Sequence, residues 1–74
     1  MPAVVILRVK DPGQRSAELL RVLEKELGVR AIPQTAGYVP VAMDDLEPGP
    51  AYDAIKEVLD RTDPGWGEHL ELRA

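Results

Sequence analysis

The chain has 74 residues, no cysteine, and 13 acidic against 9 basic residues, for a formal charge of −4 at pH 7. A domain of this size buries only about 60% of the surface of its unfolded chain, so the core is small and association is one route to further buried area. The lack of cysteine excludes a disulfide framework and a thiolate metal site, and the acidic balance argues against nucleic-acid binding. We expect a single small α+β domain over residues 1–74, and a cytoplasmic one, because no signal-like or membrane-length apolar segment is present.

Residues 3–9 read Ala-Val-Val-Ile-Leu-Arg-Val, and this β-branched run predicts a central strand. Successive side chains of a strand point to opposite faces of the sheet. One face of this strand is wholly apolar and consists of Val5, Leu7 and Val9. The other begins apolar and ends basic, with Val4, Ile6, Arg8 and Lys10.

A helix is expected next, ending at Leu27 before Gly28. Its start is indicated by residues that favour the cap and the first turn, namely Asp11, Pro12 and Gln14, with Ser16 as a rival cap. Its buried stripe consists of Leu19, Leu20, Leu23 and Leu27.

Two short strands over residues 29–34 and 38–43 are expected to form a hairpin through Thr35-Ala36-Gly37. Pro33 and Pro40 lack the donor that a central ladder needs, so they belong at edges, strand ends or bulges. At least one strand of this hairpin is therefore expected to be short or irregular.

A second helix over about residues 51–61 and a half-buried strand over residues 68–73 complete the chain. The order β-α-β-β-α-β predicts a ferredoxin-like fold, with a four-stranded antiparallel sheet and two helices on one face. The alternative is a three-stranded sheet that leaves part of residues 29–43 as a loop.

If both helices cover one sheet face, the other face is open to solvent. We expect it to display Val4, Ile6, Arg8 and Lys10 of the first strand, together with Tyr38, His69, Glu71 and Arg73. Valine and isoleucine at the centre of such a face favour coverage by a second copy or a protein partner. The sequence thus favours a non-catalytic interaction or regulatory module that associates through this face or an edge strand, with no cofactor and no membrane partner. The alternative without a partner is that the stems of Arg8 and Arg73 shield the apolar side chains.

Single-stranded nucleic-acid binding through Arg8, Lys10, Tyr38 and Arg73 is a further alternative, since it joins an aromatic side chain to cations. One tyrosine is less than such sheet surfaces normally carry, and Glu71 opposes phosphate. The sole histidine, His69, has no second histidine to complete a metal set. Asp44, Asp45 and Glu47 lack the spacing of a calcium loop, so we expect no metal site.

The opening Met-Pro-Ala-Val-Val-Ile is similar to that of the small tautomerases. The resemblance implies that Pro2, once the initiator methionine is removed, acts as a general base on keto–enol substrates. A dry pocket would lower the pKa of such an amine toward a useful range. The chain departs from these β-α-β subunits by its second helix and last strand, and the enzyme remains the alternative to a non-catalytic module.

Overall fold

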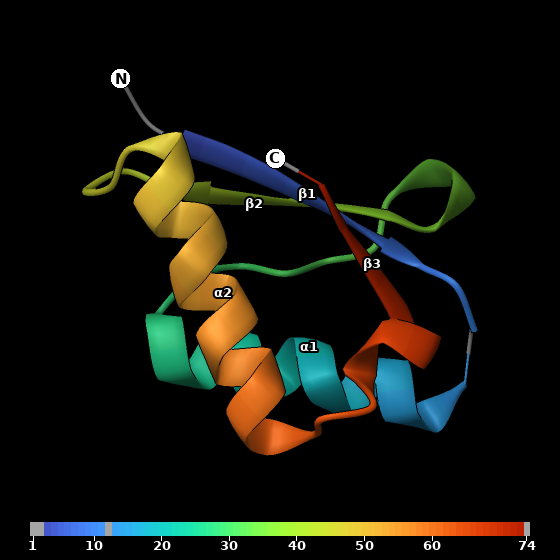
Figure 1. Ribbon diagram of the computed structural model, residues 1–74. Coiled ribbons are helices and arrows are strands. Elements are labelled where there is room, and N and C mark those ends of the chain that lie inside the picture. The colour runs from blue at the N-terminus through green and yellow to red at the C-terminus, as the bar shows by residue number, and fades with distance from the viewer. Residues whose placement is uncertain (1–2, 12, 74) are drawn as a thin grey trace.

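A three-stranded antiparallel sheet and two helices make up the fold, and the computed structural model describes residues 3–11 and 13–73. The elements in chain order are β1 (Ala3–Val9), α1 (Gln14–Leu27), β2 (Tyr38–Met43), α2 (Pro48–Thr62) and β3 (Leu70–Arg73). Two short 3-10 segments, Thr35–Gly37 and Trp66–Glu68, precede β2 and β3. The strand order is β2-β1-β3, and both helices lie on the same side of the sheet (Figure 1).

The central place of β1 confirms the prediction for residues 3–9. Its burial alternates along the strand, so that Ala3, Val5 and Leu7 are buried while the residues between them are exposed. The buried side packs against the helices. The side chains that are less than 2% exposed come from every helix and strand, and the larger ones are Val5, Leu7, Leu19, Leu23, Val39, Val41, Ile55, Leu59 and Leu70. All the buried apolar side chains form one cluster.

Helix α1 ends as predicted and begins between the two predicted starts. Gly28 follows its last residue with φ 64°, a left-handed conformation that glycine adopts without steric cost. At the other end Gly13 occupies the cap position and no side chain caps the helix. The expected caps Asp11 and Ser16 are therefore wrong. The hydroxyl of Ser16 donates to the Gly13 carbonyl at 2.8 Å instead.

The described sheet has three strands, which is the alternative architecture, and the predicted strand over residues 29–34 is not part of it. A single backbone hydrogen bond, from Gln34 N–H to the Tyr38 carbonyl at 2.6 Å, joins this segment to β2. That bond shows that Tyr38 directs its backbone groups away from β1, and alternate residues of an antiparallel strand do the same. Pro40 therefore faces this outer edge without a donor. Pro33 also lacks an N–H donor. A fourth strand paired with β2 would therefore lose hydrogen bonds both at Pro33 and at Pro40.

The last two elements keep their predicted types with shifted boundaries. α2 starts at Pro48, earlier than predicted, because prolines suit the first turn of a helix, whose N–H groups have no partner within the helix. β3 starts at Leu70, since residues 66–68 form a 3-10 turn. Among the described residues no helix combines the length and apolarity needed to span a bilayer.

Candidate interaction surface

The side of the sheet that faces away from the helices is called the open face here. Its residues follow from the strand alternation and the register, and they are Val4, Ile6 and Arg8 of β1, Tyr38, Pro40 and Ala42 of β2, and Glu71 and Arg73 of β3. Val4 is 49% exposed, and Ile6 and Tyr38 are each 38% exposed. Three of the four exposed large hydrophobic side chains in the described chain thus lie on one surface.

The open face is apolar at one end and polar at the other. Along β1 and β2 the register pairs Val4 with Ala42 and Ile6 with Pro40, which forms a continuous apolar area. The next pair is Arg8 with Tyr38. On the other side of β1, β3 adds only Glu71 and Arg73, opposite Arg8 and Ile6. The apolar area is therefore bordered by charge on one side and at one end.

Two arginines on the open face share one carboxylate. Arg8 Nη1 lies 3.7 Å and Arg73 Nη2 3.3 Å from oxygens of Glu71, and all three side chains are more than a third exposed. Exposed pairs of this kind contribute about 0–1 kcal/mol, so they do not lock the arginines in place. The open face carries one more positive than negative charge, while the chain as a whole carries −4.

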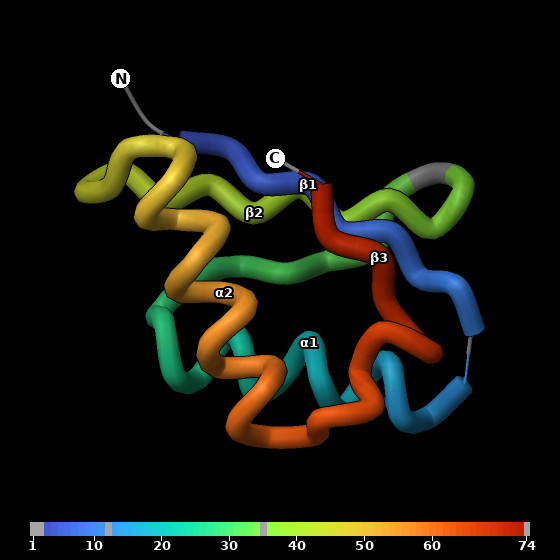
Figure 2. The backbone as a smooth tube through the Cα atoms, in the orientation of Figure 1, coloured from blue at the N-terminus to red at the C-terminus, as the bar shows by residue number. Residues whose placement is uncertain are grey.

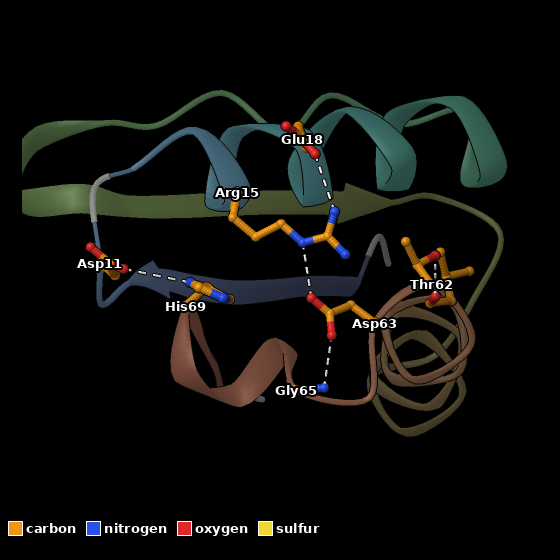
Figure 3. Close-up of polar contacts among 8 residues, drawn as sticks. Asp11, Arg15, Glu18, Thr62, Asp63, Gly65 and His69 are labelled. Atoms are coloured by element: carbon orange, nitrogen blue, oxygen red, sulfur yellow. Dashed lines mark hydrogen bonds and ion pairs between the residues drawn. The ribbon is translucent and has the colours of Figure 1, made fainter.

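Lys10 and His69 lie beyond the ends of the strands, so the open face as the strands define it does not include them. Lys10 follows β1, which ends at Val9, and His69 forms the turn before β3, which begins at Leu70. Its side chain is 23% exposed, and its Nδ1 lies 3.6 Å from Asp11 Oδ2 (Figure 3). Its carbonyl accepts the backbone N–H of Lys10 at 2.8 Å, and Lys10 Nζ donates to the Gly67 carbonyl at 3.0 Å. Both residues thus join the end of β1 to the turn before β3.

A polar cluster joins α1 to the turn after α2. Arg15 Nε donates to Asp63 Oδ2 at 2.9 Å, and the Gly65 N–H donates to Asp63 Oδ1 at 2.9 Å (Figure 3). These two bonds favour the carboxylate, with the Gly65 bond as the larger cause, and hold the pKa of Asp63 below its usual value. The Asp63-Pro64-Gly65 sequence indicates the turn. Nothing in the sequence indicates that Arg15 reaches it.

A second carboxylate anchors the tryptophan of the same turn. The indole N–H of Trp66 donates to Asp60 at 2.5 Å, and Lys56 donates to Asp60 at 2.9 Å. The indole bond is the larger cause that lowers the pKa of Asp60, followed by the Lys56 bond. Trp66 is half-buried against the core, so it serves packing.

Within residues 3–11 and 13–73 no three histidine or acidic side chains lie close enough to hold a metal ion. Pro2, the base that the tautomerase resemblance implies, lies outside the described residues, and its role stays a prediction.

The comparisons with known proteins add no relative. No family model, no curated protein and no solved structure matches the chain. The proposed function therefore depends on the open face and its chemistry.

Proposed function

We propose that this protein is a non-catalytic interaction module and that its open face packs against a second copy of the same chain. The observation that carries the proposal is the exposure of Val4 and Ile6 on the central strand, at 49% and 38%. Apolar side chains that are contiguous with Pro40 and Ala42 gain free energy when a partner removes them from water.

The face is a better candidate than either sheet edge. The outer edge of β2 lacks a donor at Pro40, and proline on an edge strand discourages pairing with another chain. β3 offers an edge of only four residues. In a contact between two such faces, Val4 and Ile6 also pack against the same residues of the second copy. Arg8 and Arg73 lie at the rim, where their charges stay in contact with water.

The size of the face sets the expected strength. Strand spacings imply a surface about 23 Å long and about 14 Å wide, or roughly 300 Å². A stable interface of standard size buries about 800 Å² on each partner. We therefore expect a weak dimer whose population depends on protein concentration.

Sedimentation velocity over a wide concentration range tests the proposal. The wild type should shift from monomer to dimer as concentration rises, whereas Ile6→Asp should stay monomeric, because a carboxylate at the interface centre would be desolvated. Its helical circular dichroism should remain that of the wild type. Ile32→Asp is the matched control, since Ile32 is exposed at 52% and lies off the open face. A strictly monomeric wild type at every concentration would contradict self-association.

Single-stranded nucleic-acid binding stays an untested prediction with less support. Arg8 and Tyr38 are direct cross-strand neighbours, as a stacking surface needs. Glu71, however, lies between the two arginines of this face and offers phosphate a like charge.

A further inference from the structure

A cavity of about 600 Å³ lies between α1 and residues 31–37, on a different part of the molecule from the open face. Ala17 and Leu20 of α1 form part of its wall, and Ile32 and Pro33 form another part. Its volume is within the range of about 300–1,000 Å³ that small-molecule sites occupy. Ile32, the one exposed large hydrophobic residue of the described chain that is not on the open face, contributes to this wall.

The path of residues 29–34 explains the cavity. This segment runs between α1 and β2 without joining the sheet (Figure 2). It is held near its start by the bond from Ala31 N–H to Glu24 Oε2 at 3.2 Å, and at its end by the bond from Gln34 N–H to Tyr38. Some of the residues that line the space opposite it are small, as at Ala17 and Gly13. A cavity is therefore left between this segment and α1.

The charges at the cavity select the ligand. Arg21 lies on the same helical face as Ala17, lines the cavity, and forms no ion pair with any residue in the described ranges. The carboxylate of Glu24, by contrast, already accepts the Ala31 N–H. A ligand therefore meets apolar walls and one cation without a partner. Because the chain carries −4 overall, a bare anion gains little from long-range attraction and needs apolar burial as well.

We propose that this cavity binds a small amphiphilic carboxylate, whose hydrocarbon body lies between Leu20 and Ile32 and whose head group pairs with Arg21. Burial of the hydrocarbon against Ile32 supplies most of the free energy of binding, because it removes apolar surface from water. The pair with Arg21 distinguishes the acid from a neutral molecule of the same length.

The test is a titration of 15N-labelled protein with decanoate below its micelle concentration, in which binding is monitored through the amide chemical shifts. We expect saturable shifts at Ala17, Ile32 and Gly37, and none that saturate at Val4 or Ile6. Arg21→Gln should weaken decanoate binding about two- to fivefold, the effect of an exposed ion pair, and should leave binding of the neutral decanol unchanged. Arg30→Gln is the matched control, because Arg30 is exposed and does not line the cavity.

A second variant tests the cavity itself. Ala17→Leu should abolish binding of both probes by filling the space, and the fold should survive because Ala17 is exposed and leucine favours helices. The proposal is overturned if no lining residue shifts saturably, if the shifts centre on the open face, or if the Arg21 and Arg30 variants weaken decanoate equally. Equal affinity of decanol and decanoate for the wild type would also overturn the assignment of an anion.

Discussion

Two consecutive residues before β2 have left-handed backbone conformations, Ala36 with φ 62° and Gly37 with φ 76°. For a residue with a Cβ atom this region costs about 1–2 kcal/mol, whereas glycine pays little. Glycine thus occupies only one of the two positions whose backbone conformation favours it. The alanine stores strain in the turn that leads into β2.

Ala36→Gly should therefore stabilise the protein by about 0.5–1 kcal/mol, the relief of strain less the added freedom of the unfolded chain. Gly37→Ala should destabilise it by about 1 kcal/mol, although a Cβ there would meet Val9 only at ordinary contact distance. Urea unfolding measures both. Ala17→Gly, in the regular part of α1, provides the opposite control and should lose about 1 kcal/mol. A loss of stability in Ala36→Gly would contradict the strain.

The outer edge of β2 is the element whose behaviour depends most on one side chain. Pro40 interrupts the donors that this edge presents to solvent, because Tyr38, Pro40 and Ala42 direct their backbone groups outward. An edge without that interruption is a template for pairing with another chain.

Pro40→Thr should restore the missing N–H and raise the tendency to associate through the edge. Threonine also favours strands, so the sheet itself should not be weakened. Static light scattering at increasing concentration should show larger species for this variant than for the wild type. Ala42→Thr is the matched control, since it adds the same side chain at a position that already has a donor. Identical scattering by the two variants would mean that Pro40 does not protect the edge.

Local patterns predicted most elements and failed where partners decide the structure. β1, β2 and the body of both helices are set by alternation or helical spacing, and both are readable in a single segment. The segment 29–34 has strand-like composition, but pairing requires donors at Pro33 and Pro40, and their combined effect depends on how two segments align. The predicted strand position of His69 differs from the structure because the 3-10 turn at Trp66–Glu68 shortens β3.

The open face could be predicted from local sequence patterns, whereas the cavity could not. Val4, Ile6, Arg8, Tyr38, Glu71 and Arg73 follow from strand alternation once the helices cover one face. The cavity beside Ile32 has no sequence signal, because it arises from a segment that does not join the sheet.

At the scale of the whole molecule, the contact from Arg15 to Asp63 ties the two helices together and makes stability depend on pH. The pKa of Asp63 is lowered in the folded protein, so its carboxylate stabilises the fold at pH values above the ordinary range of about 3.9. That contribution is lost as the pH falls through the lowered pKa, where the group takes up a proton.

Asp63→Asn should lower the urea midpoint near neutral pH, and the difference from the wild type should shrink as the pH approaches 2. Asp45→Asn is the control, because Asp45 is exposed in the loop between β2 and α2 and forms no ion pair with any residue in the described part of the chain. A difference for Asp63→Asn that stays constant over the whole pH range would show that packing, and not charge, explains the effect.

The strand order has a consequence for how the protein is made. β1 is synthesised before both of its neighbours, yet it lies between them, and its Ile6 pairs with Arg73. The edge of β1 that pairs with β3 therefore has no partner until residues 70–73 are made, and the sheet closes late, through contacts that are distant in sequence. Unpaired strand edges make incomplete chains prone to aggregation, and completion of β3 removes this one.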